Sequence, residues 1–221
     1  MSFAENLYES LIVFGTSGVV IDSSLSFSLL VQKTRLSCYR LVNICFKCFA
    51  LRDPSPFLKF YKTYVLPSIN SCSSIYALSS VSNINSIEKV QKYFTKRLFV
   101  RVFPSKLVPD YASRLSLFGL EPLEILLIRT DLNLFKLIRC IYSVPDLNFQ
   151  FSAHSNGRLL VSRVRTTKRR EFFVSRVITF WNQYVSHCTY PSLSEFRLYL
   201  STLHFDSSLR GVAFKQGRSN I

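Results

Sequence analysis

The segment Arg163–Asn182 (RVRTTKRREFFVSRVITFWN) constrains the fold most, because it joins a cationic half to an apolar half. On a helix, the apolar half would place five residues on one face: Phe173, Val177, Phe180, Trp181 and Tyr184. Such a face has to be buried against other elements, whereas the cationic half stays at the surface. The segment therefore predicts an element that is anchored in a core and presents positive charge to an acidic partner.

The composition is that of a folded chain with a large positive charge. Of the 221 residues, 48% are hydrophobic and 14% aromatic, which is enough to bury a core and offset the entropy of the chain. The formal net charge is +15 and the pI is about 9.8. Residues 1–50 hold four basic and three acidic side chains, residues 51–150 hold thirteen and seven, and residues 151–221 hold eleven and three. This balance favours polyanions, with nucleic acid before anionic membrane.

The sequence shows neither secretion nor membrane signals. It has no N-x-Ser/Thr sequon, and its N-terminus has no basic flank before an apolar core. The longest uncharged run, Thr63–Ile87, is rich in serine and asparagine and is interrupted by Pro67, so it is too polar to span a bilayer. We expect no membrane span and a reducing, intracellular compartment, nuclear or cytoplasmic.

The apolar spacing predicts a mainly α chain that starts with a short β segment. Two candidate strands, Leu11–Phe14 and Gly18–Ile21, flank a turn at Thr16–Gly18, and a second turn is predicted at Asp22–Ser24. Helical spacing then covers residues 29–49, 53–67, 86–101 and 122–142, the second half of Arg163–Asn182, and residues 191–200. We expect four parts: a β segment (1–27), a helical domain (28–145), a basic loop and helices with a turn at Asn156-Gly157 (146–205), and a flexible tail (206–221).

Three of these helices have predicted apolar faces. In the first, the face comprises Leu36, Tyr39, Val42, Phe46 and Phe49. The second begins at Asp53-Pro54, a typical helix start, and its face comprises Phe57, Phe60, Tyr61 and Tyr64. In the third, the face comprises Ile87, Val90, Phe94 and Leu98, and Pro104 ends the helix.

The third helix carries the first candidate binding site. Lys89, Lys92 and Lys96 lie opposite its apolar face, and Arg97 and Arg101 extend the row, with only Glu88 as an opposing charge. The pattern fits contact with nucleic-acid phosphates and an ordinary solvated helix face equally well.

The second candidate site is the cationic half of the opening segment. It comprises Arg163, Arg165, Lys168, Arg169 and Arg170, opposed nearby only by Glu171. Unopposed cations with aromatic neighbours favour nucleic-acid contact over attachment to anionic lipid.

The sequence has few groups for catalysis. Its three histidines are His154, His187 and His204, all late in the chain and none at a hydrolase or zincin spacing. It has no phosphate-binding or dinucleotide loop, and its aspartates are dispersed, which does not suit a two-metal site. Cys45-x-x-Cys48 has no second pair for zinc, so buried free thiols are favoured. We expect no autonomous catalysis, no metal and no cofactor.

Several sequence motifs, taken in their order and spacing, resemble those of one protein family. Gly18-Val-Val-Ile-Asp22, Tyr61-Lys62 with Val65 and Pro67, and Ile87-Glu-Lys-Val-Gln91 with Phe94 and Arg97 occur in that order. They are followed by Arg114-Leu115, Gly119-Leu120, Leu123-Glu124, Arg129 and Asp131-Leu132, and then by Phe172-Phe173, Arg176, Trp181-Asn182, Ser192-Leu193 and Phe196. In order and spacing, these motifs resemble the C-terminal part of a reverse transcriptase, an RNA-directed DNA polymerase, from a non-LTR (LINE-type, jockey-like) retrotransposon.

The resemblance implies the end of a palm (1–27), a helical thumb-like domain (28–145) and a post-thumb region. The family's thumb grips the template–primer duplex, while its palm holds metal-binding aspartates in a Tyr-x-Asp-Asp motif that this sequence does not contain. The chain departs from the pattern at Leu126-Leu127, where the family has two arginines. In this context Phe172-Phe173 and Trp181 are expected to be core anchors, and the binding role falls to the two cationic clusters.

The expected function is therefore that of a non-catalytic polymerase fragment. It would bind the backbone of an RNA–DNA hybrid or a single strand without sequence specificity. Three alternatives stay open: a structural relic or protein-interaction module, a peripheral membrane protein held by its basic clusters, and an enzyme in trans that completes a separate palm and fingers region.

Overall fold

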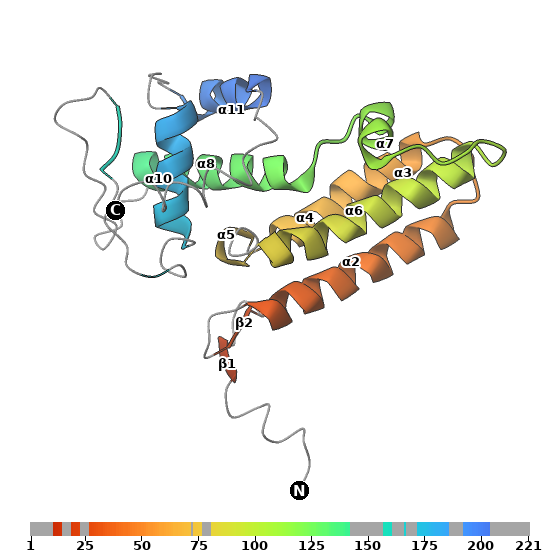
Figure 1. The fold of residues 1–221 in the computed structure, drawn as a ribbon, viewed down its shortest axis with the longest axis horizontal. Coiled ribbons are helices and arrows are strands. Elements are labelled where there is room, and N and C mark those ends of the chain that lie inside the picture. The colour runs from red at the N-terminus through yellow and green to blue at the C-terminus, as the bar shows by residue number, and fades with distance from the viewer. Residues whose placement is uncertain are drawn as a thin grey trace, which may run out of the picture. The chain divides into compact units, whose positions relative to one another are not determined.

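The computed structural model is mainly α-helical, as the apolar spacing predicted (Figure 1). It describes residues 11–14, 19–22, 27–71, 73–76, 81–141, 157–160, 166, 172–185 and 192–203. The chain divides into two compact units, residues 1–124 and 125–221. The division lies within the segment 28–145 that the sequence assigned to one helical domain, so the four predicted parts stay a prediction.

The first unit begins with two short strands. Strand β1 (Leu11–Phe14) pairs antiparallel with β2 (Val19–Asp22), so that Ile12 lies opposite Ile21. The turn predicted at Thr16–Gly18 lies outside the described residues. Of the turn predicted at Asp22–Ser24 only Asp22 is described, and it is the last residue of β2 rather than part of a turn.

Two long parallel helices form the core of this unit. Helix α2 (Ser28–Cys48) packs along α6 (Val81–Val102). Arg35 donates to Ser86 near the start of both helices, and Tyr93 donates to Asn43 further along both, which fixes their parallel course. The face of α6 predicted to be apolar, from Ile87 to Leu98, is buried. The helix begins earlier than predicted, because its first turns are rich in serine and asparagine and hide the apolar repeat.

The predicted face of α2 is wrong at Leu36. That side chain is 46% exposed, and the buried residues include Cys38, Val42, Cys45 and Phe46. Successive residues of a helix turn by about 100°, which places Leu36 on the opposite side of the helix from Cys38 and Cys45. Cysteines take the inward positions here, because a free thiol behaves as a small apolar group.

The second predicted helix contains a π turn. Helix α3 (Ser55–Phe60), the π-helix η1 (Tyr61–Val65) and α4 (Leu66–Asn70) are continuous, and Asp53 accepts a hydrogen bond from the Ser55 N–H at 3.1 Å. The fully buried side chains recur every four residues: Phe57, Tyr61, Val65 and Ile69. Residues spaced by four do not stay on one face of an α-helix, which has 3.6 residues per turn. A π turn has more residues per turn, so residues spaced by four stay closer to one face, and η1 keeps Val65 directed inward. Tyr64, predicted to be inward, is 56% exposed.

Two helices were not predicted. Helix α5 (Ser73–Tyr76) is short, and α7 (Tyr111–Phe118) packs on α6. The Asp110 carboxylate accepts hydrogen bonds from the N–H groups of Ala112 and Ser113, and Gly119 ends α7 with a φ of 59°. An N-cap aspartate and a left-handed glycine are strong local signals, and they explain why eight residues suffice for this helix.

The second unit contains most of α8 (Leu123–Ile141) with α10 (Phe173–Tyr184) and α11 (Leu193–Thr202). Its aromatic core joins Trp181 to Phe135 and Phe196, with ring centroids 5.0 and 6.0 Å apart. Ser192 caps α11 by accepting from the Glu195 N–H at 3.2 Å. The predicted loop residues from 161 to 165 and from 167 to 170, and the tail after residue 203, lie outside the described part.

Candidate nucleic-acid interface

A row of lysines lies along the outer face of α6. The side chains of Lys89, Lys92 and Lys96 are exposed, opposite the buried stripe of the same helix. The ammonium group of Lys92 lies 5.2 Å from the Tyr111 ring centroid, which positions it beside α7. The period of the sequence predicted this placement, and the three ammonium groups share one surface.

The two arginines of the predicted row lie at its edge, against α2. Arg97 donates through Nη1 to Asn43 Oδ1 at 2.5 Å and to the Tyr93 hydroxyl at 2.9 Å, and its guanidinium lies 4.6 Å from the Phe46 ring centroid. Arg101 donates to the backbone carbonyl of Phe46 at 3.4 Å. That carbonyl belongs to the last turn of α2, where carbonyls have no partner within the helix. Part of the row therefore has a structural role.

A hollow opens where α2 and α6 end. Its volume is about 730 Å³, and it is lined by Ala50 and Pro104, each two residues beyond its helix, together with Phe46, Arg52, Tyr93, Lys96, Arg97, Val100 and Arg101. Four of these nine lining residues are cationic and none is acidic. Among the described residues, the hollow is thus a cationic recess at one end of the lysine row.

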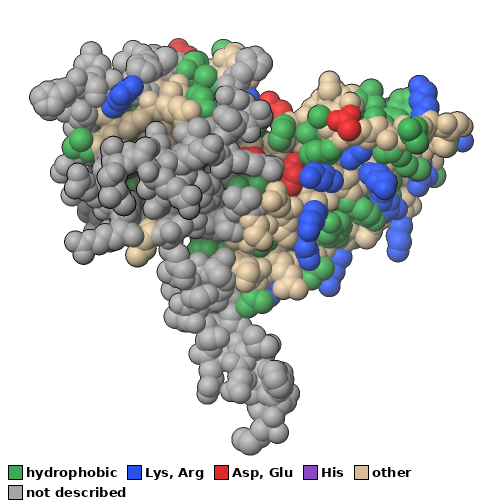
Figure 2. All heavy atoms as spheres, viewed as in Figure 1, with side chains coloured by type: hydrophobic (Ala, Val, Ile, Leu, Met, Phe, Trp, Pro, Cys, Tyr) green, Lys and Arg blue, Asp and Glu red, His purple; other side chains and the backbone are tan. Residues whose placement is uncertain are grey.

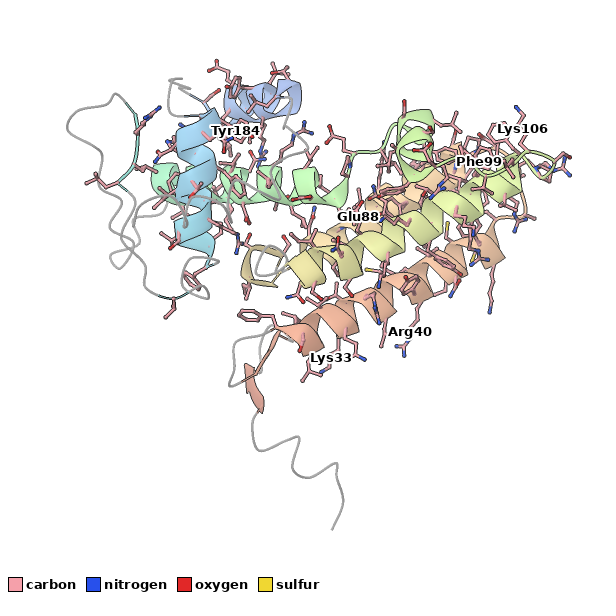
Figure 3. The ribbon with its side chains drawn as sticks, viewed as in Figure 1. Lys33, Arg40, Glu88, Phe99, Lys106 and Tyr184 are labelled. Carbon is pink, nitrogen blue, oxygen red and sulfur yellow. The ribbon has the colours of Figure 1, made fainter. Side chains whose placement is uncertain are left out.

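Helix α2 contributes further cations, which were not predicted from the sequence to form a binding site. Lys33, Arg40 and Lys47 are exposed at a spacing of seven, and α2 contains no aspartate or glutamate. Figure 2 shows Lys and Arg side chains spread over the part of the chain where α2 and α6 lie, with few Asp or Glu among them. Figure 3 shows Lys33 and Arg40 on the edge of α2 away from α6. A count of acids in each helix, rather than of cations alone, would have found this surface.

The two helices differ in the density of their cations. The outer face of α6 holds three exposed cations between Lys89 and Lys96, a rise of about 10 Å at 1.5 Å per residue. The outer edge of α2 holds three between Lys33 and Lys47, a rise of about 21 Å. The row on α6, hereafter the α6 row (Lys89, Lys92 and Lys96, with Arg97 and Arg101 at its edge), is therefore the stronger candidate for binding a polyanion.

The structure does not describe the second predicted cluster, so it gives no position for that cluster relative to this surface. Arg163, Arg165, Lys168, Arg169 and Arg170 lie outside the described residues, so their role stays a prediction.

In the first unit, the motif residues behind the family resemblance serve mainly to hold helices together. Glu88 is buried and accepts hydrogen bonds from the Tyr111 hydroxyl and from the Leu123 N–H, the latter at 3.2 Å. The carboxylate therefore sits at the N-terminus of α8, where the helix dipole favours negative charge. Gln91 accepts from the Tyr61 hydroxyl at 2.9 Å and donates to the Glu121 carbonyl at 2.6 Å.

The second unit uses its motif residues in the same way. Arg176 donates to Asp131 across 2.9 Å in a buried ion pair. Asn182 brackets the backbone of Leu159, accepting from its N–H and donating to its carbonyl, both at 2.8 Å. The prediction that Trp181 is a core anchor agrees with its 4% exposure, but the same prediction for Phe172 is wrong. Phe172 is 62% exposed because it precedes α10, so its side chain lies outside the helix face that is buried.

The thiols of α2 show no sign of activation. Burial is the main cause that raises the pKa of Cys45 to about 11, with a smaller contribution from Cys48. Burial also raises the pKa of Cys38. A reactive cysteine needs a lowered pKa, and Cys48 is exposed while Cys45 is buried. The pair therefore does not have the shared, open geometry of a redox or metal motif.

Two properties of the described residues bear on membranes and metals. None of their helices has the length and apolarity needed to cross a bilayer. No group of three or more potential metal ligands occurs among them. Comparison of the chain with protein-family models, curated proteins and solved structures finds no match.

Proposed function

We propose that the α6 row binds the phosphate backbone of nucleic acid without sequence specificity. The observation that carries this proposal is the charge between Glu88 and Asp110: six cations and no carboxylate, with Lys89, Lys92 and Lys96 exposed on one face. An ordinary solvated face mixes the two signs. A dense single-sign row attracts a polyanion, and it gives affinity without reading bases.

We further propose that the chain is the thumb-like and post-thumb part of a LINE-type reverse transcriptase. The support is the ordered motif set together with a mainly α fold. In this proposal the β1–β2 pair corresponds to the end of the palm, and α2–α7 to the thumb that contacts the template–primer. The motif residues buried in both units would then be a signature of the fold, while the exposed lysines carry the binding.

The proposal gives this segment no catalysis of its own. Four carboxylates already have structural partners: Asp53 at the start of α3, Glu88 at the start of α8, Asp110 at the start of α7 and Asp131 on Arg176. Polymerisation by two metal ions needs carboxylates gathered around both ions. A separate palm and fingers region would have to supply them.

The test is binding of a mixed-sequence RNA–DNA hybrid across a salt series. Counterion release predicts that the logarithm of the association constant falls linearly with the logarithm of the salt concentration. A second hybrid of different sequence should bind equally well. A flat salt response, or no binding at low salt, would contradict the proposal, and tighter binding to anionic vesicles would favour membrane attachment instead.

Exposed apolar residues favour a second candidate, a structural or protein-interaction module. Leu36 and Ile44 on α2 are about half exposed, and Leu107 is 95% exposed. Exposed apolar surface of this kind promotes association. A purified chain that aggregates and binds no hybrid would favour this module, whereas a monodisperse chain that melts cooperatively would count against it.

A further inference from the structure

We propose that the hollow at the C-terminal ends of α2 and α6 is a discrete phosphate-binding site for the nucleic-acid backbone, with Arg52, Lys96, Arg97 and Arg101 as its cations. This inference rests on the proposed function and deepens it, because it turns one end of a diffuse cationic row into a built site. The class of ligand is a backbone phosphate of nucleic acid.

The first step is the balance of charge. Two helix C-termini meet at the hollow, because Ala50 and Pro104 follow α2 and α6 and both line it. Each C-terminus carries about half a negative charge, so together they contribute about −1. The four cationic side chains contribute +4. The recess therefore keeps about three positive charges after its own helix ends are compensated.

The second step is that structural roles do not account for all four cations. Arg101 satisfies the Phe46 carbonyl, and Arg97 uses Nη1 for Asn43 and Tyr93. Within the part of the chain that the structure describes, neither Arg52 nor Lys96 forms an ion pair, and both side chains are exposed. Exposed cations lining a recess without a carboxylate are suited to an external anion.

The third step is pre-organisation. The guanidinium of Arg97 lies 4.6 Å from the Phe46 ring centroid and 5.4 Å from that of Tyr93, and its hydrogen bonds to Asn43 and Tyr93 hold its orientation. A guanidinium has five N–H donors, and both of these hydrogen bonds use Nη1. The N–H groups of Nε and Nη2 take no part in them and can donate to an anion. Because Arg97 is already held, binding an anion costs it little further side-chain entropy.

The fourth step concerns what part of the nucleotide is recognised. Arg101 follows Arg97 by one helical turn, so their Cβ atoms are about 5–6 Å apart, a spacing that allows both guanidinium groups to contact one phosphate. The Phe46 ring is buried and covered by Arg97, and it packs on Phe57 at a centroid distance of 4.9 Å. It is therefore not a platform for base stacking. The site recognises charge and leaves base identity unread.

The test compares two variants with equal loss of charge. Arg52→Gln with Arg101→Gln removes two cations of the hollow, and Lys33→Gln with Arg40→Gln removes two exposed cations from the outer edge of α2. We expect the hollow variant to bind the RNA–DNA hybrid at least ten times more weakly than the wild type, and the α2 variant less than threefold more weakly. Equal losses in the two variants, or no loss in the hollow variant, would overturn the site while the wild type still binds. Failure of the wild type to bind would overturn the proposed function itself.

A second measurement uses the unaltered chain, in case the hollow variant folds poorly. Phenylglyoxal modifies accessible arginines, and mass spectrometry locates the products. The hybrid should protect Arg52 and Arg101 and leave Arg40 reactive. Equal protection of all three arginines, or stronger protection by polyglutamate than by the hybrid, would overturn the inference of a phosphate site.

Discussion

The buried ion pair of the second unit gives a prediction whose size follows from the structure. Asp131 and Arg176 are 1% and 5% exposed, and Arg176 Nε lies 2.9 Å from Asp131 Oδ2. The substitution Asp131→Ala removes the carboxylate and leaves a buried guanidinium without it. Breaking a buried pair from one side costs about 3–5 kcal/mol, a large part of the 5–15 kcal/mol that stabilises a typical domain.

Urea unfolding followed by tryptophan fluorescence measures this loss. Trp181 is the only tryptophan in the sequence, and it is buried against Phe135 in the same unit as the ion pair. Its emission therefore reports the unfolding of that unit.

The matched control removes both charges. The double variant Asp131→Leu with Arg176→Met replaces the ion pair by apolar side chains, which is often neutral or stabilising relative to the intact pair. We expect it to be clearly more stable than Asp131→Ala. A loss below about 1 kcal/mol in the single variant, or a double variant as unstable as the single one, would refute the reasoning.

Three further predictions concern the first unit. Glu88→Gln keeps the shape of the side chain but loses the charge that Tyr111 and the start of α8 contact, so it should lower the free energy of unfolding by about 1.5–3 kcal/mol in urea titrations; an unchanged midpoint would contradict this. Iodoacetamide at mildly alkaline pH should modify Cys48 rapidly and Cys45 only after unfolding. Burial in the folded state raises the pKa of Cys45 from 9.0 to about 11. The protonated thiol therefore contributes to the free energy of unfolding below pH 9, and this contribution is lost as the pH rises to about 11.

The sequence predicted the helices whose apolar spacing is regular. The buried stripe of α6 from Ile87 to Leu98 is confirmed, because four apolar residues at spacings of three and four define one face without tertiary information. Tyr64 was misplaced because a π turn changes the phase of a helix without a local sequence signal. Leu36 was misplaced because hydrophobicity alone does not say that cysteines face the core.

The sequence predicted the part of the candidate site that depends on helical period and not the part that depends on helix packing. Exposure of Lys89, Lys92 and Lys96 follows from the helical period alone. The contacts of Arg97 with Asn43 and Phe46 depend on which helix packs beside α6, and residues about fifty positions apart in sequence give no sign of that. The hollow has the same origin, because it exists only where the ends of two parallel helices meet.

The proposed binding surface is tested most directly by the salt dependence of one pair of variants. Lys89→Gln with Lys92→Gln removes two exposed cations from the α6 row, and Lys33→Gln with Arg40→Gln removes the same charge from α2. The account predicts a steep salt dependence for binding of an RNA–DNA hybrid by the wild type. For the logarithm of the association constant plotted against the logarithm of the salt concentration, it predicts a slope that is shallower by about 1.4–1.8 in the α6 variant. The slope of the α2 variant should be nearly unchanged. A wild-type chain whose binding ignores salt, or two variants with the same slope, would contradict the account.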